Sequence, residues 1–136
     1  MIYSGCGSRG LSGASTAKSY QQDQITDRSG LRLTARQLKV LLIGNTETGA
    51  YFSKGKWIEY REYFRADGTI VGEENRKPFS GKWSLEGDTI CEEYEDEGAD
   101  DDCFYYVTKA SGRYEAYGMD GTLKARIRKV QKGKPL

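Results

Sequence analysis

From Tyr51 to its C-terminus, the chain alternates short stretches rich in Tyr, Trp, Phe, Ile and Val with turns that contain Gly. Tight turns of this kind join neighbouring antiparallel strands, because Gly supplies the positive φ that a short hairpin loop needs. The pattern predicts eight strands, each joined to the next by a short connection. The predicted strands cover residues 47–53, 57–65, 69–75, 79–85, 88–95, 102–109, 112–118 and 122–130.

Within most of these strands the alternation separates two faces. In strand 79–85, for example, Phe79 and Trp83 share one face with small or apolar residues, and Ser and Lys occupy the other. Strand 57–65 carries charged residues on both faces, which indicates either a polar interior or an exposed edge. Eight up-and-down antiparallel strands tend to close, because closure removes the exposed edges. We therefore predict a mostly β protein, an eight-stranded antiparallel up-and-down barrel, with a barrel-like two-sheet sandwich as the alternative.

One short helix is predicted ahead of the strands. Thr34 can cap its N-terminus, apolar residues recur at three- and four-residue spacing from Leu38 to Leu42, and Gly44-Asn45 ends it. Residues 1–30 are rich in Ser, Gly, Gln and Asp without periodic apolar positions, which is typical of a disordered leader or linker. The expected organisation is this leader followed by a single β-barrel domain over residues 31–136.

Composition argues against catalysis. The chain contains no His, which removes His-based acid–base catalysis and the Ser-His and Cys-His nucleophile pairs. No pair of carboxylates has a recognisable motif around it, so we expect a non-enzymatic protein without cofactor or metal. The acidic stretch from residue 92 to 102 has the oxygens for Ca²⁺ but not the spacing of an EF-hand loop.

Charge is unevenly distributed along the chain, although the net charge is only +1. Residues 86–102 carry ten acids and no base, whereas residues 109–136 carry eight bases against two acids. The near-neutral net charge and the acidic hairpin formed by residues 86–102 argue against binding to nucleic acid. No run is apolar for 18 residues, so no transmembrane segment is expected.

Three cysteines remain to be placed. Cys91 and Cys103 flank the acidic segment at facing ends of two adjacent predicted strands, a geometry that invites a disulfide; two buried thiols in a cytosolic protein are the alternative. Ser4-Gly5-Cys6 resembles the end of a bacterial lipoprotein signal, but no apolar stretch precedes it, so lipidation of Cys6 stays open beside a coincidental match.

The ordered residues resemble a group of small exported bacterial domains of unknown function. The resemblance covers roughly residues 31–130 and rests on the helix end Leu42-Ile43-Gly44-Asn45-Thr46, on Ala66-Asp67-Gly68-Thr69, and on Ser80-Gly81-Lys82-Trp83 leading to Cys91, with an aromatic residue beside Cys103. The Gly-x-Trp element is also similar to avidin-like and lipocalin-like barrels. The resemblance implies a β-barrel and a periplasmic or secreted location, with the cytoplasm not excluded because no complete signal peptide is visible; it brings no catalytic residues.

Two functions from different classes are expected. One is a small exported barrel that binds an apolar or aromatic ligand, which Tyr hydroxyls and an Arg would orient. Alternatively, the same aromatic residues form a packed core. Its predicted ligand-binding residues are Trp57, Arg61, Tyr63, Trp83, Tyr105 and Tyr117. The other is an envelope interaction module or inhibitor that docks a basic protein through the acidic hairpin. An internal cavity of about 300 Å³ or more would favour the first.

Overall fold

A computed structural model of the chain describes residues 30–95 and 102–134. The chain divides into two units, 1–30 and 31–136, and the fold below is that of the second. The predicted leader, Cys6 and the tip of the acidic hairpin at residues 96–101 lie outside the described residues.

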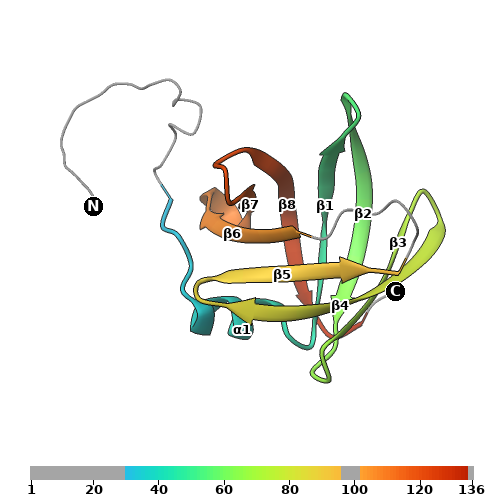
Figure 1. The fold of residues 1–136 in the computed structure, drawn as a ribbon, viewed down its shortest axis with the longest axis horizontal. Helices are drawn as coiled ribbons and strands as arrows, with labels where there is room; N and C mark the ends of the chain where they lie inside the picture. The colour runs from blue at the N-terminus through green and yellow to red at the C-terminus, as the bar shows by residue number, and fades with distance from the viewer. Residues whose placement is uncertain (1–29, 96–101, 135–136) are drawn as a thin grey trace. The chain divides into compact units, whose positions relative to one another are not determined.

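The second unit is a closed barrel of eight antiparallel strands, each paired with the next, with β8 paired to β1 (Figure 1). This confirms the up-and-down barrel, and no predicted strand end differs from the observed one by more than two residues. The elements are α1 (Ala35–Leu42), β1 (Asn45–Ser53), β2 (Lys56–Phe64), β3 (Thr69–Glu74), β4 (Lys77–Glu86), β5 (Thr89–Tyr94), β6 (Asp102–Thr108), the short 3₁₀ turn η2 (Ala110–Gly112), β7 (Tyr114–Gly118) and β8 (Leu123–Lys132).

Helix α1 closes one end of the barrel (Figure 1). It starts with a capping box, in which Gln37 N–H donates to Thr34 Oγ1 at 3.2 Å and Thr34 N–H donates to Gln37 Oε1 at 2.8 Å. Ala35 N–H donates to Asp88 Oδ1 at 2.7 Å, which ties the helix to the β4–β5 connection. The helix is thereby held with its apolar face on the barrel.

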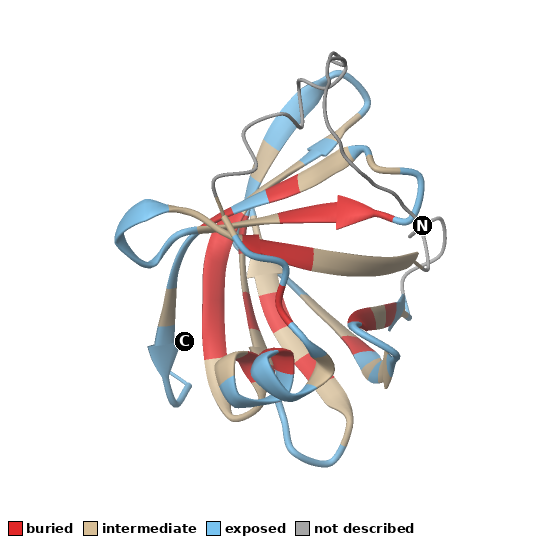
Figure 2. Cartoon of the chain, turned by 90° about the vertical axis from the view of Figure 1, so that its left-hand side faces the viewer, coloured by how far each residue is buried: buried red, intermediate tan, exposed pale blue. Residues whose placement is uncertain are grey.

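The apolar core lies at this closed end. Leu38 and Leu42 of α1 are fully buried and pack into one cluster with Phe64, Ile70 and Ile90. Figure 2 shows the same distribution along the strands, with buried segments in their central parts and exposed residues at many of the turns. The end under α1 is therefore filled by apolar side chains, which leaves the other end of the barrel for a different lining.

The seam between β5 and β6 has the fewest paired residues of the eight among the described positions. Only three pairs form it, and the middle pair is Cys91 and Cys103. These cysteines form a disulfide, which confirms the predicted bond. The bond thus joins two strands whose ladder of backbone hydrogen bonds is short.

The segment before α1 completes that seam. Leu33 N–H donates to the Tyr106 carbonyl, and Thr108 N–H donates to the Leu31 carbonyl, both at 2.9 Å. Because these bonds occupy the part of β6 that extends beyond β5, the edge of β6 is paired along its length.

Candidate functional site

A cavity of about 580 Å³ occupies the barrel interior. Its lining includes Glu47 and Glu62 in the middle of the barrel and extends to Ser53 and the exposed Lys54 in the β1–β2 turn. The volume falls within the usual range of small-molecule sites. The interior is therefore hollow toward the end opposite α1.

The turn between β1 and β2 determines which side chains face this cavity. Lys54 and Gly55 both have positive φ, of 50° and 81°, as in the two-residue hairpin turns that match strand twist. The resulting register places Glu47 opposite Glu62, and both line the cavity. Side chains two residues apart share a face of a strand, so Tyr60 also points inward.

Three glutamates on the inner face are almost completely buried. Glu47, Glu62 and Glu92 expose 1%, 4% and 6% of their surface. Glu47 accepts two hydrogen bonds from phenol groups, from Tyr60 O–H at 2.5 Å and from Tyr106 O–H at 2.6 Å. Both of these donors are neutral phenol groups.

Tyr94 lies between the other two glutamates. Its hydroxyl oxygen is 2.8 Å from Glu62 Oε1 and 2.5 Å from Glu92 Oε1. A phenol has one hydrogen to donate, so it can serve only one of these carboxyl groups. The other carboxyl group must therefore carry a proton and donate it to the Tyr94 oxygen.

The pKa values of the three glutamates agree with bound protons. Burial, together with the negative charge of Glu47, raises the pKa of Glu92 to about 8. Burial, followed by the charges of Glu92 and Glu47, raises the pKa of Glu62 well above its ordinary range. Burial also raises the pKa of Glu47, opposed by its hydrogen bonds with Tyr106, Tyr60 and Glu62.

None of the ion pairs seen among the described residues involves these glutamates. Those pairs join Arg61 to Glu73, Lys109 to Glu115 and Arg128 to Glu59. Of the cavity-lining residues, the cationic ones are Lys54 and Lys124, which lie at the β1–β2 turn and near the start of β8. Among the described residues, the acids in the middle of the cavity therefore have no basic side chain in contact.

The six residues predicted to bind a ligand do not line this cavity. On β2, Trp57, Arg61 and Tyr63 belong to the face opposite Tyr60 and Glu62. Trp57 is 40% exposed, and Arg61 Nη2 pairs with a Glu73 carboxylate oxygen at 2.6 Å. The structure thus places these three on the outside of the barrel.

The other three predicted residues also lie away from the cavity. Tyr105 and Tyr117 alternate with inward-facing residues and stack on each other at a centroid distance of 5.5 Å, with the Arg32 guanidinium 4.3 Å from the Tyr105 ring centroid. Trp83 packs against the apolar core, and its indole N–H donates to the Arg65 carbonyl at 2.7 Å. The predicted ligand-binding set therefore does not coincide with the cavity lining.

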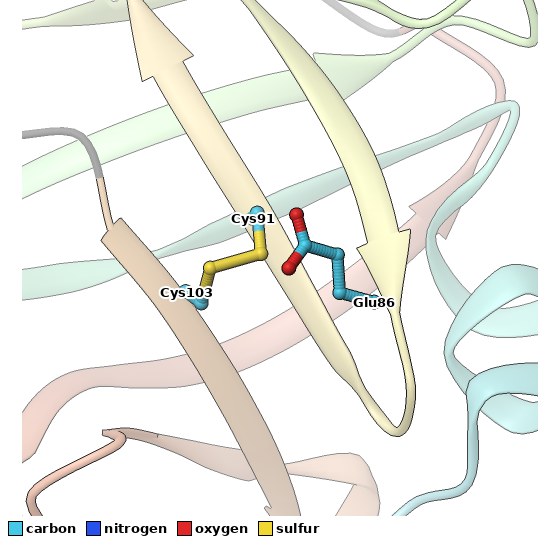
Figure 3. Close-up of side chains that lie close together, drawn as sticks. All are labelled: Glu86, Cys91 and Cys103. Carbon is cyan, nitrogen blue, oxygen red and sulfur yellow. A yellow bond between two sulfur atoms is a disulfide. The ribbon is translucent and has the colours of Figure 1, made fainter.

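The cysteines do not provide a metal site. Glu86 lies beside the disulfide between β5 and β6 (Figure 3), and potential ligand atoms of Glu86, Cys91 and Cys103 lie within 4.8 Å of one another. Metals bind thiolates, whereas both sulfur atoms are already bonded to each other. The tip of the acidic hairpin, predicted as a docking surface, lies at residues 96–101 and outside the described residues.

Sequence reasoning missed the three buried glutamates. The signal was the occurrence of charged residues on both faces of strand 57–65, one of whose two interpretations was a polar interior. The register confirms that interpretation, since Glu62 faces the cavity together with Tyr60.

Comparison with known proteins brings no further assignment, because no protein-family model, curated protein or solved structure matches the chain. Within the described residues, no helix is long and apolar enough to cross a membrane. The fold and the cavity define a closed β-barrel with a hollow, acidic interior.

Proposed function

We propose that this barrel is a non-enzymatic binding protein for a small amphipathic cation, a molecule with an ammonium or guanidinium group on an apolar or aromatic body. The observation that carries the proposal is the group of three buried glutamates, Glu47, Glu62 and Glu92, in the wall of a 580 Å³ cavity with tyrosine hydroxyls as their partners.

Buried acids without a cation are costly in their charged form, and protonation is the response when no positive partner is available. A ligand ammonium group would supply that partner. It can donate charge-assisted hydrogen bonds to carboxylate oxygens, which are stronger than bonds between neutral groups. The rings of Tyr60 and Tyr94 add surfaces that attract cations. The same acids would disfavour a carboxylate or phosphate ligand.

The rest of the lining is suited to the apolar body of such a ligand. Ile58, Phe79, Phe104 and Ala116 all contribute to the cavity wall. Sites for small molecules commonly combine apolar walls with a few polar groups that fix orientation. The proposed ligand therefore has the apolar or aromatic body predicted from the sequence, and in addition a cationic group.

The protein is further proposed to mature in the periplasm or outside the cell. The Cys91–Cys103 disulfide supports this location, because such bonds persist in oxidising compartments and are rare in the cytosol. The resemblance to exported bacterial domains points in the same direction.

A thermal-shift comparison of three matched compounds tests the binding proposal. 2-Phenylethylamine, 2-phenylethanol and 3-phenylpropionate share an aromatic body and differ in the charge of the polar end. At millimolar concentration and pH 7, the amine is expected to raise the melting temperature, because a ligand that binds the folded state stabilises it. An equal response to the alcohol, or a response to the carboxylate alone, would contradict a cation site.

Two variants locate the effect. Replacing both Glu62 and Glu92 by Gln removes the acids on either side of Tyr94 and should abolish the response to the amine. The matched control is Glu93→Gln, which removes one carboxylate from an exposed position on the same strand. If the double variant responds like the control, the glutamates serve the structure alone and the proposed function is wrong.

A further inference from the structure

The β1–β2 hairpin presents two large aromatic side chains to solvent. Phe52 and Trp57 are directly paired across the hairpin, 48% and 40% exposed, with ring centroids 5.2 Å apart. In Figure 1 this hairpin projects at the end of the barrel far from α1. Its tip is closed by the two-residue turn Lys54-Gly55, so the two rings stand on a short, regular hairpin.

Positive charge surrounds these rings. Lys54 and Lys56 are exposed at the tip, and the Arg126 guanidinium lies 4.7 Å from the centroid of the Trp57 ring. Residues 50–58 contain no acid. The nearest one along β2, Glu59, pairs with Arg128 at 2.6 Å. The tip therefore combines exposed aromatic surface with a local excess of positive charge.

The neighbouring turns at this end extend the same character. In an up-and-down barrel the β1–β2, β3–β4 and β7–β8 connections lie at one end, together with the end of β5 and the start of β6. The β3–β4 turn exposes Arg76 and Lys77, and the β7–β8 turn exposes Met119 by 63%, beside a single acid, Asp120. The acidic end of β5 is separated from the hairpin by two strands, β3 and β4, in one direction around the barrel and by three, β6, β7 and β8, in the other.

We propose that the β1–β2 hairpin docks onto the surface of an anionic lipid bilayer. Trp and Phe favour the interface between headgroups and acyl chains, and Lys and Arg near that interface are attracted to anionic headgroups. A projecting tip can enter the headgroup layer without a complementary groove in the partner. A nucleic acid strand fits less well, because bases stack on open ring faces and Arg126 already occupies one face of Trp57.

Docking in this orientation would hold the mouth of the cavity at the lipid surface. Phe52, Ser53 and Lys54 belong to the hairpin and also line the cavity. The docking itself does not rest on the proposed ligand, because it requires only the outer surface of the hairpin.

Vesicle co-sedimentation of the full chain tests the proposal. The probes are phosphatidylcholine vesicles with and without 30% phosphatidylserine, at about 0.1 M salt. The protein is expected to sediment only with the anionic vesicles and to be released at 0.5 M salt, because screening weakens attraction to the surface. Absence of binding to the anionic vesicles, or equal binding to both, would overturn the proposal.

Paired variants distinguish the hairpin from general charge attraction. Each lysine near an anionic surface contributes about a fivefold gain in partition, so K54Q/K56Q should bind roughly 25-fold more weakly. The control K39Q/K132Q removes two exposed lysines, one on α1 and one at the end of β8. Equal losses in the two double variants would exclude the hairpin as the docking element.

Fluorescence gives a second readout that does not depend on charge variants. Trp57 emission should shift to shorter wavelength when anionic vesicles are added to the wild-type protein, and W57F should lose that shift. A shift that survives in W57F assigns the change to Trp83 and overturns the proposal. A single-stranded oligonucleotide is the competitor. If the protein binds it more tightly than the vesicles and is displaced from them, the partner of the hairpin is a nucleic acid and the proposal is overturned.

Discussion

Replacement of Glu92 by Gln should change how the stability of the protein depends on pH. In the folded protein the pKa of Glu92 is raised from an ordinary value of 4.5 to about 8, first by burial and then by the charge of Glu47. Each tenfold change in proton affinity corresponds to about 1.4 kcal/mol, so this interval corresponds to about 5 kcal/mol. That is a large part of the 5–15 kcal/mol that typically stabilises a small domain.

The sign follows from proton binding in the two states. Above pH 4.5 the unfolded chain releases this proton, whereas the folded protein keeps it until about pH 8. Raising the pH therefore lowers the free energy of unfolding across this window, and the loss levels off above about pH 8. Gln resembles the protonated acid and can still accept a hydrogen bond from Tyr94, so the variant does not share this loss.

Urea unfolding at pH 5 to 9, followed by Trp fluorescence without reductant, measures the effect. Wild type and Glu92→Gln should differ by less than about 1 kcal/mol at pH 5 and by about 5 kcal/mol at pH 8.5, with the variant more stable. The charge of Glu92 is one cause of the raised pKa of Glu62, so the variant also loses less stability through Glu62, which adds to the difference in the same direction. The exposed Glu93→Gln variant should follow the wild type. A constant difference between wild type and Glu92→Gln from pH 5 to 9 would refute the raised pKa.

Three further changes test the packing of the barrel. The double variant C91S/C103S should lower the free energy of unfolding by about 3 kcal/mol in urea, because the bond closes a loop of about 13 residues in the unfolded chain; equal stability of wild type with and without reductant would contradict this. Trp83→Ala should cost at least about 2 kcal/mol, because its half-buried ring packs against the apolar core, whereas Trp57→Ala, on a side chain 40% exposed, should cost about 1 kcal/mol, and equal losses would contradict the assignment of inner and outer faces. Gly72→Ala should cost at least about 2 kcal/mol by urea unfolding, because a Cβ at this position would lie 2.3 Å from the Arg61 carbonyl oxygen and 2.6 Å from the Phe79 ring; wild-type stability would show that the barrel wall can adjust there.

Most of the fold could be predicted from the sequence because its determinants are local. Alternation with period two and Gly-containing turns mark each strand, and Thr34 with Gln37 caps the helix where the leucine spacing begins. The cysteines were also predictable, since Cys91 and Cys103 stand on adjacent strands of one hairpin.

The site could not be predicted to the same extent, because alternation shows which residues share a face but not which face points inward. Strand 57–65 has aromatic and charged residues on both faces. The sequence therefore predicts Trp57 and Tyr63 as ligand-binding residues, whereas the structure places Tyr60 and Glu62 in the cavity wall. The choice depends on register with β1 and on closure of the barrel, which are nonlocal. Buried acids are also exceptions to the general rule that charged residues lie at the surface. They cannot be predicted until the side chains that surround them are known.

Calorimetric titration of the protein with 2-phenylethylamine at pH 7, in phosphate and in HEPES, tests the central claim most directly. At least one carboxyl group around Tyr94 holds a proton in the unliganded protein, and an ammonium group bound there should release the proton that Glu92 holds up to about pH 8. The account predicts saturable binding with release of about one proton per ligand, seen as a difference in heat between the two buffers, and loss of that difference in Glu92→Gln. Binding without proton release, or equal binding of 2-phenylethanol, would contradict a cation site among these glutamates.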